Sequence, residues 1–166
     1  MLISTLASTI AALLFLAAML FATVSDLRSK RIPNWLVLTL ALAYLPLALA
    51  AGYAPASMVL NLGVAAVVFA MGLFCFSRGW IGGGDVKLGA VTVLWLGMGL
   101  ALPYLLLTAV FGAAFTLAAL IGLRFMSRGG EAKGRLRDDG LPYAPGMACA
   151  GLLLFQISPW ANALNA

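Results

Sequence analysis

Residues 2–24 read LISTLASTIAALLFLAAMLFATV, and the polar stretch SDLRSKRIPN follows directly at residues 25–34. The first stretch has no charged residue and is long enough to cross a bilayer, which takes about 20 mostly apolar residues as a helix. The polar stretch then places one carboxylate, Asp26, at the membrane boundary. An ionised group is costly there unless it is hydrated, paired or functional. This pattern predicts a membrane protein whose chemistry lies at the bilayer surface.

Similar apolar stretches recur along the whole chain. Of its 166 residues, 64% are hydrophobic and 9% are charged, whereas soluble domains carry about 25% charged residues. We expect spanning helices at residues 2–24, 35–51, 57–77, 86–102, 104–123 and 143–158. The predicted fold is therefore an all-α integral membrane protein, a bundle of six transmembrane helices that forms a single membrane-embedded domain over residues 1–166. A cleaved signal peptide at residues 2–24 is the other interpretation, but no Lys or Arg precedes this run.

The basic residues predict how the bundle is oriented. All ten Lys and Arg residues lie in or beside the segments that follow the first, third and fifth predicted spans, and residues 52–56, 98–103 and 159–166 carry no charge. Because basic connections face the cytoplasm, we expect both termini outside and a multi-pass protein of the plasma (inner) membrane. Membrane lipid is then the expected neighbour, and the net charge of +5 does not indicate nucleic-acid binding.

A second boundary aspartate follows a run of glycines. Residues 78–87 read RGWIGGGDVK, so that Asp85 comes directly after three glycines at the start of the fourth predicted span. A flexible turn with packing glycines explains the run, but it does not explain the aspartate. Asp26 and Asp85 both fall on the predicted cytoplasmic face. The remaining acidic residues lie in the long polar loop and are Glu131, Asp138 and Asp139.

The residue types that are absent narrow the chemistry. The chain has no histidine, which excludes His-based zinc sites and nucleophile–His pairs, and we expect no metal and no cofactor. Two close carboxylates share one proton, so that one activates water and the other protonates the leaving group. The helix dipole favours the anion at a helix N-terminus and disfavours it at a C-terminus. This predicts Asp85 as the base and Asp26 as the acid, although a coupled pair titrates jointly.

At these residues the chain resembles the type IV prepilin peptidases, which are GxGD aspartyl intramembrane proteases. The matching segments are DLRSKRIPN at residues 26–34, GGGDVKL at 82–88 and PYAPG at 142–146. The resemblance implies that Asp26 and Asp85 are the catalytic residues of an aspartic-type endopeptidase. Its expected substrate is a prepilin or pseudopilin precursor, whose basic leader is cut at the cytoplasmic membrane face. The supporting motif residues are then Arg31, Pro33, Asn34, Gly82, Gly84 and Lys87.

The chain departs from many bacterial relatives in one respect. It lacks their cytoplasmic insertion with paired CxxC motifs, which puts methylation of the new terminus in doubt. In this it resembles the short peptidases of tight-adherence (Flp-type) pilus systems, although archaeal preflagellin peptidases share the same dyad. The oligomeric state stays open.

Several motif residues have two interpretations. Lys87 either reaches to the membrane interface or tunes the dyad, and Asn34 is expected to satisfy backbone donors at a helix start. The segment at residues 142–146 either holds substrate in extended form or breaks a helix. The acidic loop residues either attract a basic leader or are solvated. The candidate substrate-binding residues are therefore Pro142, Tyr143, Pro145, Glu131, Asp138 and Asp139.

A rival function is a small transporter or pilus-assembly scaffold in which the aspartates are ion or proton sites. A transporter carries polar or ionisable groups near the middle of the membrane. This chain offers Asn61 and Gln156 there and no charge near the middle of a span. Its polar features gather at one face, which favours the peptidase.

Overall fold

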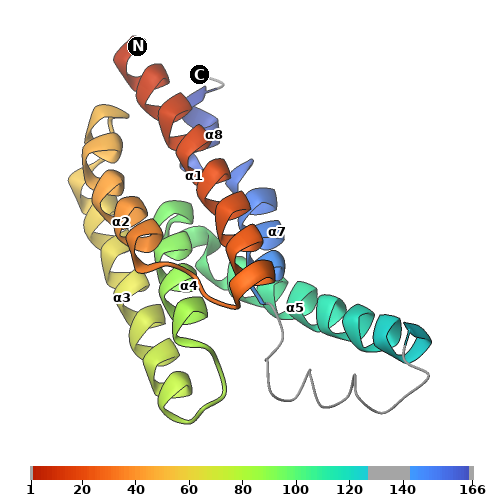
Figure 1. The fold of residues 1–166 in the computed structure, drawn as a ribbon. Coiled ribbons are helices and arrows are strands. Elements are labelled where there is room, and N and C mark those ends of the chain that lie inside the picture. Colours follow the sequence, from red (N-terminus) through yellow and green to blue (C-terminus); the bar gives the residue numbers. More distant parts are fainter. Residues whose placement is uncertain (1, 127–142, 165–166) are drawn as a thin grey trace.

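The computed structural model of the chain describes residues 2–126 and 143–164. Within these residues the backbone forms α-helices and no strand, which confirms the all-α prediction. The helices are α1 (Leu2–Ser29), α2 (Asn34–Ala50), α3 (Pro55–Ser77), α4 (Gly83–Leu96), α5 (Met98–Met126), α7 (Ala144–Phe155) and α8 (Pro159–Leu164). They pack into a bundle in which α3 lies against α4, and α7 lies against both α1 and α5 (Figure 1).

The outer helices have the character of membrane spans. By length and composition, α1, α3 and α5 can each cross a bilayer, and α2 is a shorter apolar helix. Only 11% of the most apolar 18-residue stretch of α3 is buried inside the protein. The apolar side chains of α3 therefore face outward, as they do in lipid-exposed helices. These findings confirm the prediction of a helical membrane protein. The second and third predicted spans agree with α2 and α3 to within two residues.

The predicted boundary between the fourth and fifth spans is wrong. α4 ends at Leu96 because Gly97 adopts a φ of +86°, which side chains rarely tolerate. α5 then begins at Met98, whose backbone N–H donates to Asn61 Oδ1 at 3.0 Å. Residues 98–103 are therefore helical and do not form the connection that the sequence predicted.

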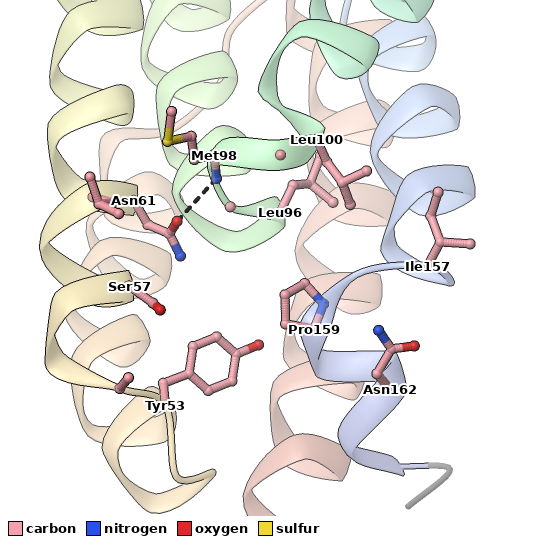
Figure 2. Close-up of a pocket in the computed structure, with 13 residues that line it drawn as sticks. Tyr53, Ser57, Asn61, Leu96, Met98, Leu100, Ile157, Pro159 and Asn162 are labelled. Carbon is pink, nitrogen blue, oxygen red and sulfur yellow. Dashed lines mark hydrogen bonds between the residues drawn. The ribbon is translucent and has the colours of Figure 1, made fainter.

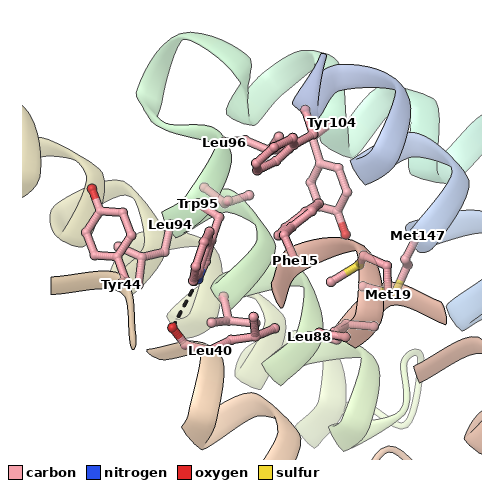
Figure 3. Packing of buried hydrophobic residues seen from close by; sticks show 14 of the residues in the cluster. Phe15, Met19, Leu40, Tyr44, Leu88, Leu94, Trp95, Leu96, Tyr104 and Met147 are labelled. Carbon is pink, nitrogen blue, oxygen red and sulfur yellow. Dashed lines mark hydrogen bonds between the residues drawn. The ribbon is translucent and has the colours of Figure 1, made fainter. Parts of the chain in front are cut away.

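α4 is the buried centre of the bundle. Its 14 residues correspond to about 21 Å of helix, which is shorter than the hydrocarbon layer of about 30 Å. All of its residues from Val86 onward are buried except Lys87. A helix that is apolar on every side belongs in a protein interior, and Figure 3 shows Leu88, Leu94 and Trp95 of α4 among residues of its neighbours.

Two buried tryptophans bond the end of α4 that lies away from Asp85 to the neighbouring helices. Trp95 Nε1 donates to the Leu40 carbonyl at 3.0 Å, and Trp160 Nε1 donates to the Trp95 carbonyl at 2.8 Å. Their rings stack with centroids 5.3 Å apart. Trp160 belongs to α8, a helix that the sequence analysis left as an uncharged tail. Buried indole N–H groups need acceptors, so these bonds hold α2, α4 and α8 in register.

The helices α5 and α7 approach each other through glycines. A Cβ atom on Gly146 would lie 2.9 Å from the Gly112 backbone nitrogen, so the two backbones are in direct contact. Small residues allow such close crossings between membrane helices. This contact fixes where α7 begins, and Figure 1 shows the later part of α5 leaving the bundle beyond it.

We expect Gly146→Ala to destabilise the protein by about 1–3 kcal/mol, because the added methyl group pushes α5 and α7 apart. Gly63→Ala is the matched control: it also lies inside a helix, and its added Cβ has no neighbour within 4 Å. The control variant should be more stable than wild type by up to about 1 kcal/mol, because alanine has a higher helix propensity than glycine. Thermal unfolding of the purified protein in detergent measures both, and equal midpoints for the two variants would contradict this packing.

Candidate active site

Asp26 lies in the last turn of α1. The sequence analysis placed residues 25–34 in a loop, but α1 continues to Ser29. Its end is closed by Lys30, which adopts a left-handed φ of 53° and donates its N–H to the Asp26 carbonyl at 2.9 Å. The Ser25 hydroxyl then donates to the Arg31 carbonyl at 2.7 Å, which turns the chain toward α2. These bonds shorten the predicted loop and hold Asp26 on a rigid element.

The carboxylate of Asp26 has a partner from a distant part of the chain. Asp26 is only 6% exposed, and a buried carboxylate requires hydrogen-bond donors. The Ala144 backbone N–H donates to Asp26 Oδ2 at 3.0 Å. Ala144 is the first residue of α7, where the N–H groups have no partner within the helix. Asp26 therefore caps α7 across 118 residues of sequence.

Asp85 occupies the first turn of α4, as the sequence predicted. Gly82 is the residue before the helix, with an extended backbone. The Asp85 side chain accepts a hydrogen bond from the Gly82 backbone, in the manner of an acidic residue at the third position of a capping box. This contact aims the carboxylate back toward the connection that precedes α4.

The two glycines of the GxGD pattern leave room for specific contacts. A Cβ atom on Gly82 would lie 2.9 Å from Asp85 Oδ2, and one on Gly84 would lie 3.2 Å from the Ile32 Cβ. Ile32 is buried in the connection between α1 and α2. Gly84 therefore lets the segment that follows Asp26 lie directly against the start of α4. This close approach brings the elements that carry the two aspartates together.

The two carboxyl groups interact electrostatically. The pKa of Asp85 is raised from 3.8 to about 6, mainly by burial and to a smaller extent by the negative charge of Asp26. The hydrogen bond with the Gly82 backbone acts in the opposite direction. Because Asp85 precedes the predicted span at residues 86–102, this pKa belongs to a group at the boundary of the bundle. Such mutual influence is what a pair of carboxyl groups that shares a proton requires.

The raised pKa of Asp85 weighs against its assignment as the base, and that assignment stays a prediction. That prediction rested on the field of the helix N-terminus, which contributes about 0.3–1 kcal/mol. At Asp85 the cost of desolvating the anion is the largest effect and outweighs the stabilisation by backbone donors. The sequence shows the helix terminus but not how deeply the side chain is buried.

Lys87 and Asn34 form a contact between the two motifs. Lys87 Nζ donates to Asn34 Oδ1 at 2.9 Å, which joins the N-terminal part of α4 to the start of α2. The prediction that Asn34 satisfies backbone donors of its own helix is wrong, because Pro33 is the N-cap of α2 and no side-chain cap bond is present. Lys87 therefore has a defined partner at this end of the bundle.

The third motif forms a helix start and not an extended strand. Tyr143 is the N-cap of α7, and Pro145 lies in the first turn, where a missing N–H costs nothing. Ala144 and Pro145 are buried and helical, so an extended segment through residues 144–146 is excluded. Arg31 is exposed next to the end of α1. The other substrate-binding candidates lie outside the described residues and are Pro142, Glu131, Asp138 and Asp139.

A cavity of about 600 Å³ lies at the opposite end of α4 from Asp85 (Figure 2). Its lining includes Leu96 and Gly97, together with Tyr53, Asn61 and Asn162. Leu96 is 11 positions after Asp85, which corresponds to about 16 Å along the helix. This cavity is therefore separate from the pair of carboxyl groups.

The site thus combines two interacting carboxyl groups at one end of the bundle. The basic residues Arg28, Lys30, Arg31, Arg78 and Lys87 flank α1, α3 and α4 at this same end. Among the described residues, no three His, Cys, Asp or Glu side chains gather as a metal site would need. The pair can exchange protons with a bound water molecule, which is the chemistry of hydrolysis by two carboxyl groups.

Comparison with known protein families gives a match over most of the chain. A family model described as the type IV leader peptidase family matches residues 13–117. The matched range contains both Asp26 and Asp85 and ends before the segment at residues 142–146. Neither a search of curated proteins nor a search of solved structures produced a significant match.

Replacing Asp85 by Asn should stabilise the protein at alkaline pH. The pKa of Asp85 is about 6 in the folded state and 3.8 without burial, so wild-type stability falls as pH rises through this range. We expect Asp85→Asn to exceed wild type by about 1–2 kcal/mol at pH 8, after allowance for partial exposure, and to match it below pH 4. Thermal unfolding in detergent across this range measures the difference. A variant less stable than wild type at pH 8 would contradict the desolvation argument.

The contact between Lys87 and Asn34 should give a measurable coupling energy. Lys87→Met and Asn34→Ala each remove the same hydrogen bond, so the double variant should lose about 0.5–1 kcal/mol less than the sum of the single variants. Lys30→Met is the matched control, because Lys30 is exposed and its side chain has no hydrogen bond to Asn34. Strictly additive losses for Lys87 and Asn34 would show that this contact contributes nothing to stability.

Proposed function

Because this chain belongs to the type IV leader peptidase family, we propose that it is an aspartic-type endopeptidase with Asp26 and Asp85 as its catalytic dyad. The function of the chain is that of a prepilin leader peptidase. The observation that carries the dyad is the electrostatic effect of Asp26 on the pKa of Asp85. Two helices that are far apart in sequence thereby contribute carboxyl groups whose protonation is coupled. A purely structural role for the two aspartates would not require this coupling.

In the proposed mechanism Asp85 carries the proton and Asp26 is the ionised partner. The raised pKa of Asp85 supports the first assignment. The backbone donor at Ala144 supports the second, because hydrogen bonds are stronger when the acceptor is charged. Asp26 takes a proton from water as the water attacks the scissile carbonyl. Asp85 polarises that carbonyl and then donates its proton to the leaving amine as the C–N bond breaks.

The proposed substrate is a prepilin-type precursor with a basic leader and an apolar helix. The exposed apolar surface of α3 and α5 suits a protein embedded in membrane lipid, next to an apolar substrate helix. Cleavage at the end that carries Asp26 and Asp85 places the cut bond where the substrate helix leaves the membrane. The absence of a CxxC insertion from the sequence supports the short Flp-type subclass and cleavage without methylation.

We also propose the topology predicted from the charges, with a single domain over residues 1–166. Six crossings by α1, α2, α3, α4, α5 and α7 put both termini on one side of the membrane. The described basic residues then lie on the cytoplasmic side of the inner membrane together with the dyad. The short helix α4 fits this scheme because its neighbours, and not lipid, cover its apolar surface.

The rival function as a transporter or scaffold rested partly on Asn61 as a polar residue within a span. Asn61 of α3 is buried, donates to the Tyr44 hydroxyl at 2.9 Å and accepts from the Met98 N–H. Both bonds join helices of the bundle and satisfy the amide. Asn61 is therefore explained by packing, so that the pair of boundary aspartates remains as the chemical feature.

We expect Asp26→Asn and Asp85→Asn each to reduce leader cleavage by about 10³-fold or more. Asparagine keeps the size and hydrogen bonding of the side chain but cannot exchange a proton. The assay follows cleavage of a candidate pilin precursor in membranes that contain equal amounts of each variant. Retained cleavage by either variant at normal protein level would reject the dyad and would favour the interpretation of the aspartates as ion or proton sites.

The cleavage rate should fall as pH rises through about 6, because Asp85 must be protonated to act as the acid. This fall in rate on the alkaline side reports the titration of the coupled pair of aspartates and not of one residue alone. Initial rates of the wild-type enzyme in detergent, measured between about pH 5 and 8 with one precursor, test it. A rate that still increases above pH 7 would instead assign the proton to another group.

A further inference from the structure

The turn of α4 that carries Asp85 packs against one face of α3. A Cβ atom on Gly72 of α3 would lie 2.6 Å from Val86 Cγ1. A Cβ atom on Gly83 would lie 3.3 Å from Cε2 of Phe76. Gly72 and Phe76 are four positions apart in α3, so they lie on the same face of that helix. This face therefore contacts the residue two positions before Asp85 and the residue directly after it.

The Asp85 side chain leaves α4 on the side away from α3. Gly83 and Val86 are three positions apart and lie together on the face of α4 that meets α3. At 3.6 residues per turn, Asp85 lies about 130° around the helix from the midpoint between these two residues. Helix α3 therefore supports the turn from behind, and the separation of α3 and α4 determines how far the Asp85 carboxyl group extends.

The same turn is also held from a second side. A Cβ atom on Gly84 would lie 3.2 Å from the Cβ of Ile32, which is buried in the connection that follows α1. The turn around Asp85 is thus enclosed by α3 on one side and by this connection on another. A change in the contact with α3 cannot be absorbed without moving the turn against its other neighbour.

The contact between Gly72 and Val86 has no spare room. Val86 is 6% exposed, and a valine in a helix has one strongly preferred side-chain rotamer. Val86 therefore cannot rotate away from a methyl group added at position 72. Because carbon atoms pack at about 3.5–4.0 Å, the separation of 2.6 Å would have to open by about 1 Å. The turn that carries Asp85 would take up this shift.

The need for glycine on α3 is specific to this contact. Gly63 lies in the same helix, and a Cβ atom there would have no neighbour within 4 Å. Glycine inside a helix is less favourable than alanine by about 1 kcal/mol. At Gly63 nothing in the described structure offsets this cost, whereas at Gly72 the missing side chain is what allows α3 to approach Val86.

We propose that Gly72 is a positioning residue of the enzyme, which sets the place of Asp85 relative to Asp26 by bringing α3 into contact with Val86. Gly72 acts through Val86 and is not itself a catalytic residue. The catalytic consequence rests on the proposed function of the dyad. Water attack and proton transfer require the reacting atoms in a narrow geometry, and a misplacement of about 1 Å can slow a reaction about 100-fold.

The first test compares Gly72→Ala with two control variants of α3. We expect Gly72→Ala to lower kcat for cleavage of a pilin precursor about 100-fold, with KM little changed, because a displaced carboxyl group slows the bound substrate. Gly63→Ala adds the same methyl group in open space. Ala65→Val overfills the core at a buried position two turns before Gly72. Both controls should keep kcat, measured per folded enzyme in detergent below the unfolding midpoint.

The second test removes the atoms that the added methyl group would meet. In Val86→Ala the remaining Cβ of residue 86 lies 3.3 Å from the added Cβ, which a small adjustment can accommodate. Gly72→Ala should therefore slow cleavage about 100-fold in the wild-type background but less than about threefold in the Val86→Ala background. The unfolding midpoints of the same four proteins should show the same relief, because the overpacking is removed.

Several results would overturn the proposal. Equal fold losses of cleavage in the two backgrounds would show that the contact with Val86 does not position Asp85. A loss of kcat in Ala65→Val as large as in Gly72→Ala would assign the effect to general destabilisation. An increased KM at unchanged kcat would assign it to substrate binding. Retained cleavage by Asp26→Asn or Asp85→Asn would instead reject the dyad, so the two proposals fail by different results.

Discussion

The hydrogen bond from the Ala144 N–H to Asp26 Oδ2 is the contact on which the arrangement of the site depends. It satisfies a buried carboxylate and the free N-terminal donor of α7 at once. The bond forms only because α7 begins at this position, and α7 begins there because Gly146 lies in backbone contact with Gly112 of α5. A close helix crossing and a charged side chain therefore determine each other's position.

The second aspartate is positioned by the same kind of close approach. Gly84 permits the buried Ile32 to lie against the start of α4, so the connection after α1 packs on the helix that carries Asp85. The resulting burial raises the pKa of Asp85. A solvated aspartate ionises near about pH 4, whereas burial and the nearby Asp26 charge favour the protonated form of Asp85. Packing at a small residue thus contributes to the environment that favours the protonated form of Asp85.

The sequence predicted much of this arrangement and missed specific parts. The spans at residues 35–51 and 57–77, the boundary positions of both aspartates and the absence of strands follow from apolar length and residue type. The end of α1, the turn at Gly97 and the helix α8 were missed, since each depends on tertiary contacts. Residues 142–146 were expected either to hold substrate in extended form or to break a helix, but Pro145 lies in a first turn whose donor is bound by Asp26.

The sequence by itself indicated the membrane class and the helical fold, because these depend on composition and on local spacing along the chain, and it predicted two aspartates at helix boundaries. The family match, which spans residues 13–117, agrees with that reading. Only the tertiary structure decided which aspartate has the raised pKa, which backbone group binds Asp26, and that Lys87 meets Asn34. These properties depend on burial and on contacts between residues far apart in sequence, and no local pattern encodes how much water a side chain loses when helices pack.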